Sequence, residues 1–131
     1  MKRVHRPGVV LHLCAEELVR LGAKCTDNAV IAVKDNHFFL CIEVDAQGSM
    51  WTPLFSDPGN GRKIIQSEHK HGHQKWIAGN TYYNPLQLWE ASHKAIHSAA
   101  KKAQDKSSRN APNTVAAAAI PDRNEFPEFP A

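Results

Sequence analysis

The sequence lacks a long run of apolar residues, has few cysteines and carries little net charge. Its 131 residues include three cysteines and have a formal net charge of +3. Without an apolar stretch of about 20 residues, a membrane-spanning helix is not expected. Residues 9–14 are too short an apolar run for a signal peptide. Three cysteines without a Cys-x-x-Cys pair favour reduced thiols. We therefore expect a cytoplasmic protein, a class that includes proteins encoded by phages and mobile elements.

The length sets the number of domains. A chain of 131 residues can bury one hydrophobic core but not two. We predict a single domain over residues 1–106, followed by a Pro/Ala-rich tail over residues 107–131. The tail has one short apolar patch and a proline-rich end, and such a segment cannot form a core of its own. Two alternatives follow: the tail wraps back and buries Phe126 and Phe129, or residues 121–131 dock on a protein partner.

The first half of the chain predicts one helix and a small antiparallel sheet. Residues 8–21 place apolar side chains close to the helical period, and Gly22 is a typical residue to end that helix. Residues 29–33 and 38–44 predict a β-hairpin. Residues 49–55 predict a third strand, which Pro53 would confine to a sheet edge. The expected class is α+β.

Residues 62–104 predict a strand, a loop, a second strand and a helix. Residues 62–66 and 76–83 are rich in β-branched or aromatic side chains and are separated by a polar loop that contains glycine. Asn84 is a favoured N-cap, and Pro85 suits the first helical position because no backbone donor is needed there. The predicted helix runs from there through about residue 104.

Four side chains in this stretch suit the hydrolysis of a phosphodiester. His93 and His97 are four residues apart and would project from one helix face. The first strand would deliver Glu68 and His69 to that face. The reaction needs a base to deprotonate water and a divalent cation to stabilise the leaving oxygen. Imidazole titrates near neutral pH, and a carboxylate with two imidazoles can hold a metal ion while leaving positions open.

The spacing of these residues resembles the HNH, or His-Me finger, nucleases. Glu68-His69 is followed by fourteen residues and Asn84, then by eight residues and His93, then by three residues and His97. The motif is most similar to that of the nuclease bacteriocins. The resemblance implies a C-terminal ββα-metal motif in which His69 is the general base and Asn84 fixes its ring. It also implies that Glu68, His93 and His97 hold a metal ion, although the family usually has Asp or His at the position of Glu68.

The same resemblance implies the cofactor and the substrate. The ion would be Mg²⁺, with Mn²⁺, Ni²⁺ or Zn²⁺ as alternatives, and the protein would be a metal-dependent endonuclease acting on DNA. The residues leave RNA open as a substrate. Five basic side chains are expected to contact phosphates: Lys70, Lys75, Lys94, Lys101 and Lys102. Two other classes remain open, namely a non-catalytic nucleic-acid- or protein-binding module on a degenerate HNH fold and a small regulatory protein with structural zinc.

Overall fold

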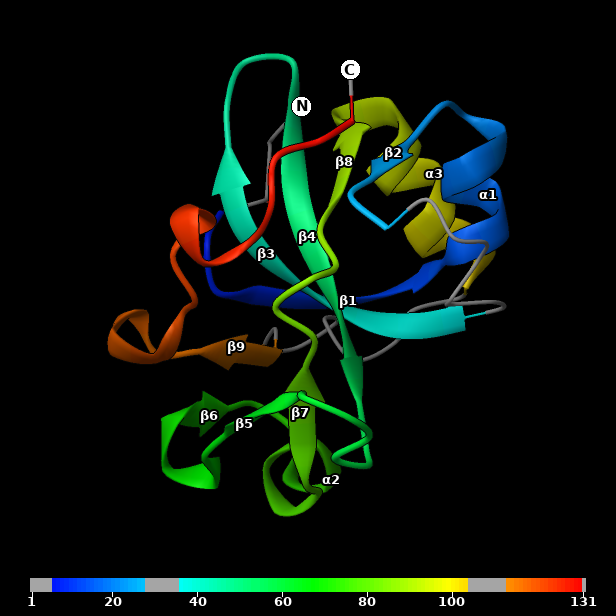
Figure 1. Cartoon of the computed structure of the whole chain (residues 1–131). Coiled ribbons are helices and arrows are strands. Elements are labelled where there is room, and N and C mark those ends of the chain that lie inside the picture. Colours follow the sequence, from blue (N-terminus) through cyan, green and yellow to red (C-terminus); the bar gives the residue numbers. More distant parts are fainter. Residues whose placement is uncertain (1–5, 28–35, 104–112, 131) are drawn as a thin grey trace.

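The computed structural model describes residues 6–27, 36–103 and 113–130 (Figure 1). These residues form a mixed α+β fold with a large antiparallel sheet, which confirms the expected class. The strands are β1 (Val9–Cys14), β2 (Lys24–Cys25), β3 (Asn36–Val44), β4 (Gly48–Phe55), β5 (Lys63–Ile65), β6 (Lys70–His71), β7 (Thr81–Tyr83), β8 (Trp89–Ser92) and β9 (Asn113–Val115). The predicted strand at residues 29–33 lies outside the described residues.

The strands are joined in the order β2-β8-β4-β3-β1-β9-β6, and β7 pairs with both β4 and β5. The helices are α1 (Ala15–Arg20), α2 (Gln74–Ala78) and α3 (His93–Lys102), with short 3₁₀ turns at η1 (Ser67–His69), η2 (Ala117–Ala119) and η3 (Arg123–Glu125). None of the described helices is long and apolar enough to cross a bilayer.

The predicted N-terminal helix is wrong over its first half. Residues 9–14 form β1, which lies between β3 and β9. Val9 and Leu11 pack in one hydrophobic cluster, whereas Val10 packs in the other. Because both faces of β1 are buried, nearly every position is apolar. The alternation of apolar and polar residues that usually marks a strand is therefore missing from the sequence. Only α1 is helical, and Gly22 ends it with a φ of 91°.

The sheet separates the two hydrophobic clusters. Successive residues of β3 alternate between them, so that Phe39 packs in the first cluster and Leu40 in the second. Helices α1 and α3 cover the first cluster, and Figure 1 shows them together at one side of the molecule. The second cluster lies under the β5–β7 pair, α2 and the C-terminal segment.

The third predicted strand is present as β4, but its predicted position at a sheet edge is wrong. Strand β4 pairs with β3 on one side and with β8 on the other. Its pairing with β8 ends at Trp51, and its pairing with β7 begins at Leu54. Pro53 falls in the gap between these two pairings, where the backbone donor that it lacks is not needed. Gly48 is required beside β8, because a Cβ there would lie 2.3 Å from the Ala91 carbonyl oxygen.

The region of the predicted ββα motif folds differently from the prediction. Strand β5 forms as expected and pairs with β7. Residues 74–78, however, form α2 where the start of the second strand was expected, and the predicted helix from Asn84 begins only at His93. The Asn84 side chain accepts a hydrogen bond from the Leu86 backbone N–H at 2.9 Å and stabilises a turn. Residues 89–92 then form β8 between β2 and β4.

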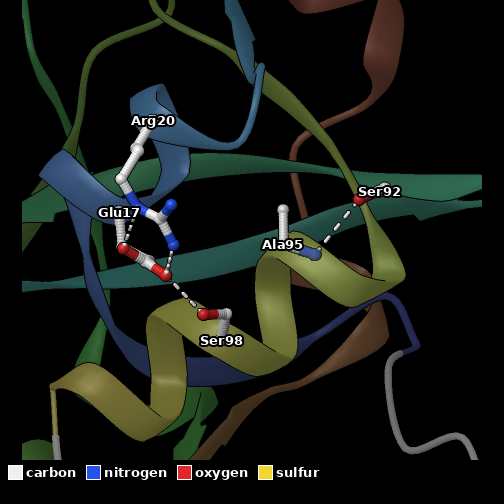
Figure 2. A network of polar contacts seen from close by, with 5 residues as sticks. All are labelled: Glu17, Arg20, Ser92, Ala95 and Ser98. Carbon is white, nitrogen blue, oxygen red and sulfur yellow. Dashed lines mark hydrogen bonds and ion pairs between the residues drawn. The ribbon is translucent and has the colours of Figure 1, made fainter.

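Helix α3 begins where Ser92 caps it. The Ser92 hydroxyl accepts a hydrogen bond from the Ala95 backbone N–H at 3.1 Å (Figure 2). The buried Glu17 carboxylate of α1 accepts hydrogen bonds from Arg20, at 2.9 and 2.7 Å, and from the hydroxyl of Ser98 in α3. These contacts fasten α1 to α3. The hydrogen bonds from Arg20 and then Ser98 lower the pKa of Glu17 to about 2.

The C-terminal segment returns to the body of the protein. Strand β9 pairs with β1 and β6. Phe126 is 4% exposed in the second cluster, with its ring centroid 6.0 Å from that of Tyr83. Glu125 accepts hydrogen bonds from the Tyr83 hydroxyl and, at 2.8 Å, from Lys63. The tail therefore wraps back as one alternative expected, with Phe126 buried and Phe129 partly buried against the same cluster. Docking of residues 121–131 on a protein partner stays a prediction.

Candidate functional site

The predicted catalytic and metal-binding residues lie on different parts of the fold. Glu68 and His69 belong to η1, which leads into β6, whereas His93 and His97 belong to α3. Figure 1 shows β6 and α3 at opposite sides of the molecule. Within residues 6–27, 36–103 and 113–130, no three His, Cys, Asp or Glu side chains are placed to hold a metal ion. The structure therefore does not bring Glu68, His93 and His97 together.

Glu68 and His69 form an exposed pair of their own. The Glu68 carboxylate is 79% exposed, and its Oε2 lies 3.6 Å from Nε2 of His69. The His69 carbonyl accepts a hydrogen bond from the Ala116 backbone N–H at 2.8 Å, which attaches η1 to the C-terminal segment. A solvent-exposed contact of this kind contributes little stability.

The helix histidines face other partners. Nε2 of His93 lies 2.9 Å from the Asp45 carbonyl oxygen, at the turn between β3 and β4. The Asp45 carboxylate accepts hydrogen bonds from the backbone N–H groups of Gln47 and Gly48, both at 2.9 Å. His97 is exposed one turn further along α3. Asp45 therefore takes the place beside His93 that the prediction gave to Glu68.

The five predicted phosphate-binding lysines divide into three environments. Lys94, Lys101 and Lys102 are exposed on α3, and Lys75 is exposed on α2. Lys70 is only 3% exposed, and burial lowers its pKa. A single surface made of all five lysines is therefore absent.

A pocket of about 340 Å³ opens where the start of β3 and the end of β4 meet α2 and β7. We call it the aromatic pocket. Its lining residues are rings, one lysine, small polar side chains, a leucine and a glycine: His12, Asn36, His37, Phe38, Leu54, Phe55, Ser56, Lys75, Trp76, Gly79, Asn80 and Thr81. None of these residues is acidic. A pocket with this lining favours a ligand that has both an apolar ring and negative charge.

Two sets of rings form the walls of the aromatic pocket. His12 lies opposite Phe38 in the β1–β3 pairing, with ring centroids 4.7 Å apart, and Phe38 lies 6.2 Å from Trp76. On the other face of the sheet, His37 lies 5.1 Å from Phe55. The aromatic pocket therefore lies at the end of the β3–β4 pair, where rings from both faces meet.

One guanidinium group lies against the second set of rings. The Arg62 guanidinium lies 3.7 Å from the centre of the Phe55 ring and forms an ion pair with the exposed Asp57 at 2.7 Å. Burial lowers the pKa of His37, and electrostatic interactions with His12 and Arg62 lower it further. The His37 imidazole is therefore neutral at pH 7.

Two buried polar atoms at the aromatic pocket have no hydrogen-bond partner among the described residues. They are Nε2 of His37 and Nε1 of Trp76. Most buried polar atoms in folded proteins are hydrogen-bonded, and exceptions are often found at functional sites. The two atoms therefore also favour a functional site at the aromatic pocket.

The aromatic pocket was not predicted from the sequence, because its residues come from four segments that are far apart in the chain. The available signal was a set of aromatic and histidine side chains inside apolar strands, at His12, His37 and Phe38. Neither a protein-family model, a curated protein nor a solved structure matches the chain. The likeness to HNH nucleases thus depends on the motif residues alone.

Proposed function

We propose that the protein binds single-stranded nucleic acid through the aromatic pocket. The observation that carries this proposal is the lining, in which aromatic rings occur together with Lys75 and without an acidic residue. Proteins that bind single strands combine aromatic rings, on which bases stack, with positive charge that follows the phosphates. The proposal shares nucleic-acid binding with the binding-module alternative raised by the sequence, but it does not require the degenerate HNH fold of that alternative.

The size and shape of the aromatic pocket favour an unpaired strand. Its volume of about 340 Å³ is near the lower end of the range for small-molecule sites, which is about 300–1,000 Å³. Such a volume accommodates one nucleotide but not a duplex. In a duplex the base faces are covered by neighbouring bases, whereas an unpaired base can place its face against the partly exposed Phe38.

Metal-dependent cleavage of DNA stays a prediction. It requires Glu68, His93 and His97 to bind one ion, and the described structure keeps η1 and α3 apart. Binding through the aromatic pocket requires none of these three residues.

The proposal is tested by fluorescence anisotropy with labelled strands of about 12 nucleotides, within the range of site sizes known for single-strand binders. We expect single strands to bind more tightly than the matching duplex, and the affinity to fall as salt rises because counterions are released. Phe38→Leu should weaken binding about 5- to 150-fold, the effect of losing one stacked base. Lys75→Gln should also weaken binding.

Lys94→Gln is the matched control, because it removes the same charge from α3, away from the aromatic pocket. We expect it to bind as wild type does, and thermal unfolding should confirm that each variant is folded. The proposal would be contradicted if Lys94→Gln and Lys75→Gln lost the same affinity for single strands. It would also be contradicted if the duplex bound as tightly as a single strand.

A further inference from the structure

Lys70 is a buried cation whose partners are all neutral. Its ammonium group donates hydrogen bonds to the Gly79 carbonyl and, at 2.9 Å, to the Thr81 hydroxyl. It also lies 4.8 Å from the centre of the Trp76 ring. Among the described residues, no carboxylate forms an ion pair with it. A buried charge without a counter-ion destabilises a fold unless another group compensates it.

The position of Lys70 connects it to the aromatic pocket. Gly79, Thr81 and Trp76, the three groups that hold the ammonium, all line the pocket. The positive charge therefore lies directly behind the wall formed by α2 and β7. Protein screens charge less than water does, so this charge acts on a group placed against the wall. Lys75 adds a second positive charge on the same wall.

The row of rings that begins at Trp76 continues away from Lys70. The Phe38 ring centroid lies 6.2 Å from that of Trp76, and the His12 ring centroid lies 4.7 Å from that of Phe38. At this end of the row, Asn36 at the start of β3 supplies an amide. A flat ring stacks on such a wall, and an amide can both donate to and accept from the edge of a base. The aromatic pocket is thus divided into an end for a ring and an end for an anion.

From this division we infer that the aromatic pocket takes one unpaired nucleotide in a fixed direction. The phosphate lies against the α2–β7 wall beside Lys75 and in front of Lys70. The base lies on the Phe38 wall. This inference rests on the proposed function and adds to it a base subsite and a phosphate subsite.

The inference is tested by displacing a labelled single strand from the protein with AMP, adenosine and ribose 5-phosphate. We expect AMP to compete about 5- to 150-fold better than ribose 5-phosphate, because only AMP has a base to stack. Phe38→Leu should remove most of this difference. Lys75→Gln should reduce the affinity for AMP and for ribose 5-phosphate by the same factor. The affinity for adenosine should not change.

Lys70→Met extends the test to the buried charge. As with Lys75→Gln, the affinity for both phosphate-bearing competitors should fall and the affinity for adenosine should not change. If Lys70→Met does not fold, Lys75→Gln still tests the phosphate subsite, and Lys94→Gln again serves as the control with no expected change.

The outcomes separate this inference from the proposed function. If single strands bind but AMP competes no better than ribose 5-phosphate, the base subsite is wrong and the binding function stands. If Lys75→Gln reduces the affinity for adenosine as much as the affinity for AMP, the proposed orientation of the nucleotide is wrong. If no single strand binds at all, the proposed function fails, and this inference fails with it.

Discussion

Glu17 shows how one buried carboxylate can join two helices. It is 5% exposed and accepts hydrogen bonds from Arg20 in its own helix and from Ser98 in α3. These hydrogen bonds are stronger when the carboxylate is ionised, so they lower its pKa from 4.5 to about 2.

This shift predicts a dependence of stability on pH. A group whose pKa is lower in the folded state stabilises the protein above its unfolded pKa, and this stabilisation is lost as pH falls through the folded pKa. For Glu17 the loss should occur between pH 4.5 and about pH 2. In Glu17→Gln the free energy of unfolding, measured by urea denaturation, should therefore fall less over this pH range than it does in wild type. Glu16→Gln, at the exposed neighbouring position, is the control. Parallel curves for Glu17→Gln and wild type would contradict this role.

Single residues also show the limits of sequence reading. Lys70 and Lys75 are both lysines near the predicted motif, and nothing in their local sequence separates them. One is buried behind the aromatic pocket and the other is exposed on its wall. Burial depends on β6, α2 and β7 meeting, which the neighbouring residues do not specify.

At the scale of elements, local signals identified several strands but placed one helix wrongly. Strands β3, β4 and β5 were predicted because they are apolar segments bounded by turns. Asn84 and Pro85 have the chemistry of a helix start, yet they form a turn. Ser92 is an equally suitable cap, and the pairing of Trp89 with Trp51 in β4 selects strand over helix for residues 89–92. Helix and strand propensities of residues 89–92 contain no information about this long-range pairing, so they could not predict the strand.

The separation of η1 from α3 makes the metal prediction testable at this scale. The HNH prediction requires one strong site for Mn²⁺ or Ni²⁺ that is lost both in Glu68→Gln and in a His93→Ala/His97→Ala double variant. Because the structure does not bring these residues together, we expect calorimetry to show the same metal binding in both variants as in wild type. Loss of one tight site in both variants would restore the HNH ligand set. Mg²⁺-dependent nicking of plasmid that is abolished in His69→Ala would then follow.

At the scale of the whole molecule, the class was predictable and the topology was not. Periodicity and turn residues were enough to predict the α+β class, whereas the aromatic residues of the tail left both wrapping and docking on a partner open. The strand order depends on pairings such as Val9 with Thr114, which no local pattern indicates. The aromatic pocket exists only after β1, β3, β4, α2 and β7 have met, so the motif search over residues 62–104 could not find it.

The three tryptophans provide the most direct test of where the ligand binds. Trp76 lines the aromatic pocket, whereas Trp51 and Trp89 are buried in the first cluster. In ¹H–¹⁵N spectra each indole gives its own signal. On titration with a single strand, we predict a large shift of the Trp76 indole and of the Lys75, Gly79 and Thr81 amides, with Trp51 and Trp89 nearly unchanged. Shifts confined to the amides of α3, with the Trp76 signal unmoved, would contradict binding at the aromatic pocket.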